Sequence, residues 1–410
     1  MNHSAHVAAP FPPVAVIGAG PNGLATAAML RRAAVPVTVL ERAERVGASW
    51  AGRYDHLQLH TTRRSSHLPG LRLPRQCGAW VGRDDFLRYL EHYRAHHGLD
   101  VRLNTTVDLI EPHDGGRNAP WRVHTSDGTL TACAVVVATG RCHTPYVPPW
   151  PGREGFSGAL LHAADYRNPV PYQGRTVLVV GAGNSGTEIA AVLSEHGARR
   201  VWLSLRTPPN ILPRSFSRGQ VAGRLTEFLP MAWRDRSSLL TQRCAVPDLT
   251  SFGVPLPRTG AYSRNEAEGV NPVLDHGFVA AVRSGRVRPV AAVEGFEEAH
   301  VVLADGTRLS PDVVIAATGY RPRLESLLAV PSVLDDAGYP VVRGPRTCAT
   351  APHLYFTGFT NPLSGALYQA GVEARGIARA VARGAAYGSV PSPRRPERTP
   401  GRKTDESTHR

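Results

Sequence analysis

The clearest pattern in the chain is a short apolar run followed by a glycine turn and an alanine-rich segment. Residues 14–17 alternate β-branched and small apolar side chains, which predicts a buried parallel strand, and the segment through residue 28 is rich in Ala, Leu and Met, which predicts a helix. The turn between them contains three glycines in the G-x-G-x-x-G spacing: Gly18, Gly20 and Gly23. A second strand is expected at residues 37–40 and ends in Glu41. The stretch therefore predicts a strand–turn–helix–strand unit.

The same pattern occurs again at residues 176–191. An apolar strand precedes a helix rich in Ala and Ile, and the glycines between them repeat the spacing: Gly181, Gly183 and Gly186. The next strand, residues 201–205, contains no acid and is followed by Arg206. Arginine pairs with a phosphate that an acid would repel, so the second unit suits NADP better than NAD. A solvated surface arginine is the alternative interpretation of Arg206.

The glycine spacing has a physical reason in both units. It permits a tight turn, close approach of the backbone to a pyrophosphate, and close packing of helix on strand. The helix N-terminus adds N–H groups and a dipole that favour anions. Glu41, about 20 residues beyond the first turn, is placed to hold a ribose hydroxyl. We therefore predict two dinucleotide sites; a glycine turn in some unrelated α/β domain is the alternative.

Weaker patterns predict the remaining elements. Helices are expected at residues 83–98, 218–228, 233–242, 275–284 and 367–385. Short alternating segments predict a small antiparallel sheet at residues 106–110, 121–125 and 130–134, a hairpin at residues 295–310, and a strand at residues 353–358. The polar, proline-containing stretch 54–75 shows no period, and a long irregular stretch of this kind is usually functional.

Two further buried strands, VVVATG at residues 135–140 and DVVIAATG at residues 312–319, both end in Thr-Gly. We interpret them as the points where the chain leaves and re-enters the first domain. The fold class is thus α/β, with two Rossmann-like dinucleotide-binding domains, the second inserted into the first. The expected divisions are a lead-in at 1–12, the first domain at 13–150 and 299–386, the inserted domain at 151–298, and a disordered basic tail at 387–410.

Composition narrows the function without defining it. The 410 residues are 42% hydrophobic and 20% charged, as in soluble globular proteins, and no run of 18 apolar residues predicts a membrane span. The first residues lack the pattern of a signal peptide. The net charge of +14 is spread along the chain, and no nucleic-acid motif accompanies it. We therefore expect no nucleic-acid or membrane partner, only a general attraction for anionic cofactors and substrates.

Residue counts exclude several chemistries. Lys403 is the single lysine and lies in the tail, so neither a Schiff base nor a P-loop lysine is expected in the folded body. Five cysteines without a C-x-x-C pair fit a reducing, cytoplasmic compartment and argue against a redox dithiol. His92 and His96 lie four apart, but no carboxylate or cysteine partner is evident, so we expect a solvated helix face and no metal site.

Between the two glycine motifs, residues 156–167 read FSGALLHAADYR. They match the F-x-G-x-x-x-H-x-x-x-(Y/F) fingerprint of flavin-dependent monooxygenases through Phe156, Gly158, His162 and Tyr166. The order GAGPNG, ATG, fingerprint, GAGNSG, ATGY, FTGF covers residues 14–385 and resembles the flavin-containing monooxygenase family. The segments YDHLQLH, NPVLDHG and ATGYRP look most like its plant-type branch, which oxidises indole-3-pyruvate, and more distantly like its N- and S-oxygenating branch.

The resemblance implies a mechanism. NADPH on the second domain would give a hydride to FAD on the first, and the reduced flavin would add O₂ as a C4a-hydroperoxide that passes one oxygen atom to a small organic substrate. The site must then exclude water, and the protein supplies orientation and electrostatics. The substrate would be a carbonyl compound such as an aromatic 2-oxo acid, or a soft N or S nucleophile. The alternative is an NAD(P)H-dependent flavoprotein reductase without oxygenation. An oligomer is compatible with either.

The resemblance also implies site residues. FAD would contact Gly18, Gly20, Gly23, Glu41, Trp50, Thr139 and Gly140, with ordinary packing as the alternative for Trp50. NADPH would contact Gly181, Gly183, Asn184, Ser185, Gly186 and Arg206. Further cofactor-binding candidates at later strand ends are Thr318, Gly319 and Gly358.

Three residues are candidates for a catalytic role. His162 and Tyr166 would couple the linker to NADPH positioning, with plain interdomain packing as the alternative. His60 stands where the N- and S-oxygenating branch has an asparagine, and it would donate a hydrogen bond toward the flavin; a surface histidine is the alternative. Arg214 is a candidate receptor for a substrate carboxylate.

Overall fold

The computed structural model describes residues 12–113, 121–214 and 229–384. The first of its two large sheets is entirely parallel and has the order β22-β9-β1-β2-β5. Its strands are β1 (Val14–Ile17), β2 (Val37–Leu40), β5 (Val101–Arg102), β9 (Ala134–Val137) and β22 (Leu354–Phe356). We call this sheet with its covering elements the first unit.

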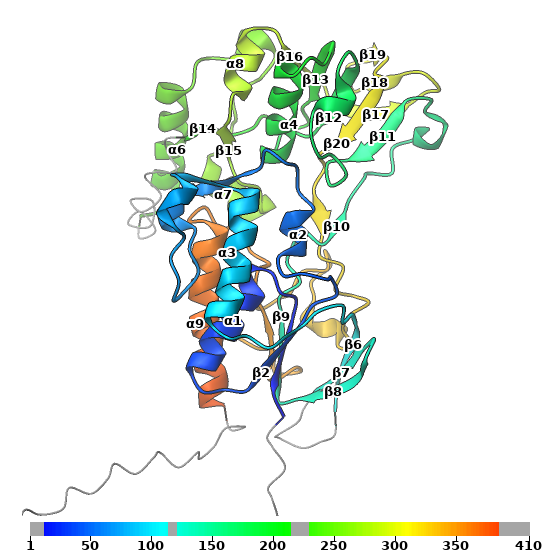
Figure 1. Cartoon of the computed structure of the whole chain (residues 1–410). Coiled ribbons are helices and arrows are strands. Elements are labelled where there is room, and N and C mark those ends of the chain that lie inside the picture. The colour runs from blue at the N-terminus through cyan, green and yellow to red at the C-terminus, as the bar shows by residue number, and fades with distance from the viewer. Residues whose placement is uncertain (1–11, 114–120, 215–228, 385–410) are drawn as a thin grey trace, which may run out of the picture.

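Alternation along the strands divides the first unit into two cores. Val14 and Val16 of β1 pack under the helices α1 (Pro21–Arg32), α3 (Arg83–His96) and α9 (Ala366–Arg383). Ala15 and Ile17 face the meander β6 (Val107–Pro112), β7 (Trp121–Thr125) and β8 (Gly128–Ala132). Successive strand side chains point to opposite faces, so a wholly apolar strand requires cover on both. Figure 1 shows the blue α1 and the orange α9 side by side on one face and the meander on the other.

The second unit repeats this plan. Its parallel sheet has the order β11-β20-β12-β13-β16. The strands are β11 (Ala159–His162), β12 (Thr176–Val180), β13 (Arg200–Ser204), β16 (Val287–Val290) and β20 (Val313–Ala316). One face carries α4 (Asn184–Glu195) and α8 (Phe278–Arg283). The other carries the meander β17 (Val293–Phe296), β18 (Val301–Leu303) and β19 (Arg308–Leu309).

The sheet pairing contradicts part of the expected domain division. We interpreted the strand DVVIAATG as a return to the first domain, but β20 pairs with β11 and β12 inside the second sheet. Strand β20 follows the second meander in the same way that β9 follows the first meander. Strand β20 is therefore the counterpart of β9. The chain re-enters the first unit after Gly319, about 20 residues later than the predicted boundary at 298. The predicted 295–304 strand is likewise two strands, β17 and β18, joined by a turn.

Smaller elements connect the two units. The pair β10 (Thr144–Pro145) and β21 (Tyr320–Arg321) is antiparallel and joins the outgoing and returning chain. Stretch 54–75, expected to be irregular, contains β3 (Gln58–Thr62), which pairs with β4 (Trp80–Gly82). Other elements are α2 (Ala48–Ala51), β14 (Ile211–Pro213), α6 (Met231–Ala245), α7 (Ala261–Glu268) and β15 (Val273–Asp275). Short 3-10 helices span Arg63–Ser65, Arg75–Cys77, Arg153–Gly155, Val170–Tyr172, Thr250–Phe252 and Pro331–Val333.

Other predicted elements have varied outcomes. The helices at 83–98 and 367–385, the first meander and the strand at 353–358 are confirmed, with small shifts of their ends. The 218–228 helix lies outside the described residues, as do the tail and nearly all of the lead-in. Among the helices of the described ranges, none combines the length and apolar character that a membrane span requires.

Both glycine turns are built on one backbone contact. Gly18 adopts φ 104°, and a Cβ placed on Gly23 would lie 1.9 Å from the Gly18 carbonyl oxygen. The second turn repeats this geometry, with Gly181 at φ 112° and a Gly186 Cβ 1.9 Å from the Gly181 oxygen. Only glycine tolerates such an approach without backbone movement. The first and third glycines of each motif therefore set the packing of helix on strand.

Gly23→Ala is expected to destabilise the protein, because the new methyl group meets backbone that cannot move aside. The expected loss is about 3 kcal/mol or more, measured by urea unfolding of cofactor-free protein. Gly20→Ala is the matched control: Gly20 has φ −77° and its Cβ would have nothing within 4 Å. Equal loss in the two variants would contradict the backbone-contact explanation.

Candidate functional site

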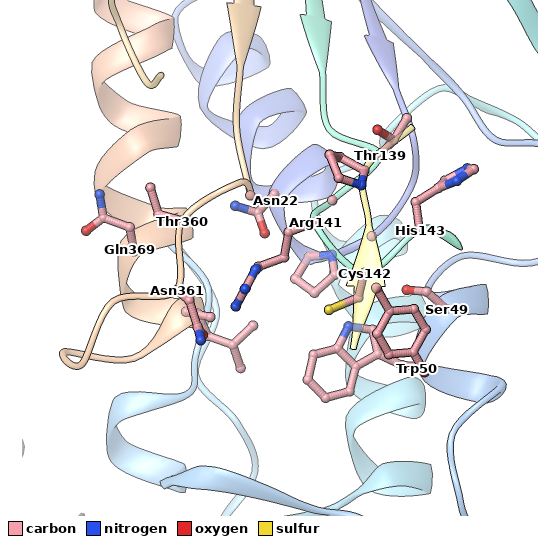
Figure 2. Close-up of a pocket in the computed structure, with 18 of the residues that line it drawn as sticks. Asn22, Ser49, Trp50, Thr139, Arg141, Cys142, His143, Thr360, Asn361 and Gln369 are labelled. Carbon is pink, nitrogen blue, oxygen red and sulfur yellow. The ribbon is translucent and has the colours of Figure 1, made fainter. Parts of the chain in front are cut away.

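A cavity of about 1360 Å³ lies between the two units and is lined by both. Most of the sequence-predicted site residues line it: Gly18, Gly20, Glu41, Trp50, His60, Thr139, Gly140, His162, Gly183, Asn184, Ser185, Gly319 and Gly358. Six others do not: Gly23, Tyr166, Gly181, Gly186, Arg206 and Thr318. Of these, Gly23, Gly181 and Gly186 shape the turns from behind. Figure 2 shows part of the cavity lining, including Trp50 and Thr139.

Both glycine turns present an uncapped helix N-terminus to this cavity. Gly20 is the N-cap of α1 and Gly183 the N-cap of α4, and neither helix receives a side-chain cap. Nothing lies within 4 Å of a Cβ built on either glycine, so the space beside each is open. The first N–H groups of a helix need an acceptor, and together with the dipole they favour an anion. The residues present therefore fit a phosphate group at each turn.

Glu41 braces the first turn at the end of β2. Its Oε2 accepts the N–H of Ala19 at 2.7 Å, and Oε1 accepts the N–H of Ala43 at 3.0 Å. The side chain is buried yet lines the cavity. A carboxylate has about four acceptor sites, so two remain for hydroxyl donors. This geometry fits the ribose contact that the sequence predicts.

Thr139 and Asn22 contribute polar side chains to the cavity lining (Figure 2). The Thr139 hydroxyl is buried and has no hydrogen-bond partner among the described residues. Asn22 donates to Thr357 Oγ1 at 3.1 Å, and Thr357 donates to the buried Glu373 at 2.7 Å. An unsatisfied hydroxyl at a cavity wall indicates a bound group that completes it.

His162 uses both ring nitrogens for structure. Nδ1 accepts the N–H of Ala164 at 3.0 Å, so Nε2 carries the proton and donates to the Gly319 carbonyl, also at 3.0 Å. Burial lowers the pKa of His162, which keeps the ring neutral. It therefore ties β11 to the Thr-Gly turn after β20 and has no nitrogen left for proton transfer. Its place agrees with a coupling role and not with acid–base chemistry.

Tyr166 does not face the cavity. Its side chain is fully buried beside Tyr54 and His56, and its hydroxyl has no partner among the described residues. Burial raises the pKa of Tyr166 well above its ordinary value. A side chain enclosed in the core does not touch a bound substrate, so Tyr166 is not placed for direct chemistry. Its predicted coupling of the linker to NADPH positioning stays a prediction, with interdomain packing as the alternative.

Sequence reasoning missed a buried cluster around Glu188 of α4, which is 5% exposed. Tyr54 donates to its Oε2, and His60 donates Nε2–H to its Oε1 at 3.2 Å. His276 Nδ1 lies 3.5 Å from the same Oε1. The sequence did contain a signal for this cluster. Glu188 lies within the apolar run TEIAAVL, and an acid that is buried in such a run requires hydrogen-bond partners.

Hydrogen bonding governs the charge of this cluster. Burial alone would raise the pKa of Glu188, but the hydrogen bond from His60 and the nearby imidazoles outweigh it, so the net pKa is lowered and the group stays ionised. Burial and the Glu188 charge raise the pKa of Tyr54, so its phenol keeps its proton and donates.

In the described part of the chain, His60, Glu188 and His276 bring three ligand-type atoms within 4.8 Å of one another. His92 and His96 are exposed, as expected.

The two arginines singled out from the sequence lie outside the cavity lining. Arg206 is exposed and comes just beyond the carboxyl end of β13, which pairs with β12, the strand before the second glycine turn. Arg214 donates to Gln58, and its guanidinium lies 4.2 Å from the centre of the Trp80 ring. Arg141 does line the cavity, and its Nη2 donates to the Gly269 carbonyl at 3.3 Å.

Two tyrosines test the difference between packing and hydrogen bonding. Tyr166→Phe removes a hydroxyl without a partner, so stability should change by less than about 0.5 kcal/mol. Tyr54→Phe leaves Glu188 Oε2 without its donor and should cost about 1–3 kcal/mol. Urea unfolding of both variants measures the difference. A larger loss for Tyr166→Phe would show that its hydroxyl has a role that this geometry lacks.

Comparison with protein families and with known proteins indicates a nucleotide-dependent oxidoreductase, in agreement with the site geometry. Residues 15–216 match the family described as pyridine nucleotide-disulphide oxidoreductase. Probable indole-3-pyruvate monooxygenase YUCCA3 of Arabidopsis thaliana is 34% identical over 376 residues, 88% of this chain and 85% of that protein.

Two solved structures have a similar fold. The flavin-containing monooxygenase from Stenotrophomonas maltophilia has a TM-score of 0.68 and 26% identity, covering 90% of this chain and 98% of that chain. Bacillithiol disulfide reductase from Bacillus cereus has a TM-score of 0.65 at 21% identity, with the same coverages, and shows a shared fold alone. The chain therefore belongs to the flavin-containing monooxygenase family and is similar, over most of its length, to the plant indole-3-pyruvate monooxygenases.

Proposed function

We propose that the chain is an FAD- and NADPH-dependent monooxygenase that places one oxygen atom of O₂ into a small organic substrate. The observation that carries this proposal is that two uncapped helix N-termini, each behind its own glycine turn, open into one cavity. When bound, FAD supplies the hydride acceptance and the O₂ activation that no side chain here can perform. The protein itself has to bind and orient the cofactors and the substrate and to enclose them.

Each turn has a proposed role. The first turn would hold the pyrophosphate of FAD at the α1 N-terminus, with Glu41 on the ribose and Thr139 completing the contact. The second would hold the pyrophosphate of NADPH at the α4 N-terminus. Asn184 lines the cavity at that turn, and its amide is held in place: the oxygen accepts from the N–H of Leu274, and the nitrogen donates to the Pro272 carbonyl.

His60 is the residue we propose to act nearest the chemistry. It lines the cavity from β3, in the stretch that the sequence identifies as functional. Its Nε2–H is held by Glu188, which leaves the other nitrogen for a bound group. His162 and the β10–β21 pair would keep the two units together and so limit the entry of water.

We propose a carbonyl substrate, in particular an aromatic 2-oxo acid, with N or S nucleophiles as the alternative. The relative from Arabidopsis thaliana is named for indole-3-pyruvate. Arg141 is a better candidate than Arg214 to receive the carboxylate, because it lines the cavity and no acid lies within 4 Å of it in the described ranges. Figure 2 shows Arg141 among the polar side chains of the cavity.

The function is tested with the FAD-loaded protein, NADPH and ¹⁸O₂. Indole-3-pyruvate, a neutral aromatic ketone, an amine and a sulfide are supplied in turn. The expected result is one ¹⁸O atom in the product from indole-3-pyruvate and NADPH use that matches product formation. If NADPH is consumed and only hydrogen peroxide appears with every compound, oxygenation is rejected and the reductase alternative is favoured.

Arg206→Ala should weaken NADPH binding by on the order of tenfold or more and leave NADH binding nearly unchanged, because the lost guanidinium pairs only with the 2′-phosphate. Isothermal titration with both nucleotides measures this. Arg200→Ala is the control, since Arg200 is an exposed arginine at the opposite end of β13. Equal weakening of NADPH and NADH by Arg206→Ala would remove Arg206 from the site.

We also propose that the protein works in a reducing, cytoplasmic compartment. All five cysteines lie in the described ranges, and none forms a disulfide. Proteins of oxidising compartments usually pair their cysteines.

A further inference from the structure

The carboxylate of Glu188 belongs to the second unit, but its hydrogen-bond donors come from earlier in the chain. Glu188 is the fifth residue of α4, and the residue is 5% exposed. The hydrogen bonds to its two oxygens come from Tyr54 and His60, which precede the second unit in the sequence. His60 lies on the connecting strand β3, and Tyr54 packs against the core of the second unit. A buried carboxylate without donors costs several kcal/mol. The position of the second unit on the first is thus tied to this one side chain.

The same contact defines the state of the His60 ring. An ionised carboxylate only accepts hydrogen bonds, so Nε2 of His60 must carry a proton. Nδ1 has no partner among the described residues and is not a buried atom, while the ring lines the cavity. The nitrogen of His60 that stays accessible is therefore Nδ1, on a ring that lines the cavity.

We propose that Glu188 is a positioning residue that fixes the ring orientation and tautomer of His60 across the boundary between the units, so that Nδ1 is presented to the bound reactants. The inference rests on the proposed function, because it takes His60 as a residue of the oxygenation site. It adds a specific device: His60 is correctly oriented only while the NADPH-binding helix sits on the first unit. A carboxylate that orients a histidine in this way is effective elsewhere without touching substrate.

The other neighbours of Glu188 leave this arrangement intact. His276 Nδ1 is 3.5 Å from the shared Oε1, farther than His60, and burial lowers the pKa of His276, which favours its neutral form. Arg214 and His56 also act on Glu188 through space, and neither makes a hydrogen bond to it in the described structure. His60 is thus the ring whose orientation the carboxylate controls.

The first test reads the tautomer directly and needs no turnover. FAD-loaded protein carrying ¹⁵N-histidine is studied by NMR, with the His60 signals assigned by their loss in His60→Asn. On the neutral ring, the expected spectrum shows the proton on Nε2, and Glu188→Ala should give a mixture of tautomers. An Nδ1–H tautomer in the natural protein, or an unchanged His60 signal in Glu188→Ala, would overturn the proposal.

The second test asks whether Glu188 acts through His60. Rates of product formation and NADPH affinities are compared for His60→Ala, Glu188→Ala and the double variant. Loss of correct positioning should lower the rate on the order of 10²-fold in each single variant. The double variant should lose no more than either single variant, since both changes remove the same function. Independent, multiplying losses would indicate a merely structural role for Glu188 and contradict the proposal.

Two variants control for folding. Glu188→Gln keeps an acceptor oxygen without the charge, so its rate should lie between those of Glu188→Ala and the natural protein. Glu195→Gln changes an exposed acid on the same helix, near Arg286, and should behave like the natural protein. A Glu188→Gln rate no better than that of Glu188→Ala would count against orientation by hydrogen bonding.

Failure of the inference and failure of the proposed function give different results. If the natural protein forms no oxygenated product, the proposed function fails, and the NMR tautomer still decides whether Glu188 orients His60. If product forms and His60→Ala lowers its rate but Glu188→Ala does not, only the inference fails. Rates are measured with and without a chelator, and a rate that the chelator lowers would show that a metal ion, not a proton, lies between these groups.

Discussion

The structure depends on the contact of a helix backbone with the carbonyl oxygen of a glycine turn. A side chain at Gly23 or Gly186 would overlap that oxygen, so each helix lies directly against its own strand. This contact brings the first helical N–H groups to the end of the strand, where no side chain caps them. Local backbone geometry thus produces an anion site at each turn, and the shared cavity makes the two sites face each other.

The boundary between the units has a second role. Its ties are polar and specific: His162 to Gly319, Glu188 to Tyr54 and His60, and the β10–β21 pair. Polar contacts of this kind fix the position of one unit relative to the other without joining the hydrophobic cores of the two sheets. Water that enters such a site destroys the activated oxygen before it reaches the substrate. A boundary between the units that excludes water is therefore as important as the binding sites.

The sequence predicted the local features well. The glycine spacing, the apolar strands and the long amphipathic helix at the C-terminal end depend on nearby residues, and the structure confirms all three. Most of the predicted cofactor residues line one cavity because they sit at the carboxyl ends of parallel strands, where ligands of such sheets bind. Their individual contacts with FAD and NADPH stay predictions.

Long-range features were less predictable. The strand DVVIAATG was assigned to the wrong sheet, although its position after a meander repeats that of VVVATG and could have revealed the internal repeat. Tyr166 matched a fingerprint, yet the pattern could not show that its hydroxyl points into the core. Glu188 was passed over because its partners, Tyr54 and His60, lie more than 120 residues away in the sequence.

The central claim is that a flavin and a nicotinamide meet in the cavity between the two turns. The most direct measurement is the absorbance of FAD-loaded protein after anaerobic mixing with NADPH. The account predicts complete bleaching of the oxidised flavin band, followed by its return when O₂ is admitted. A flavin that binds but keeps its full absorbance in excess NADPH would contradict the account.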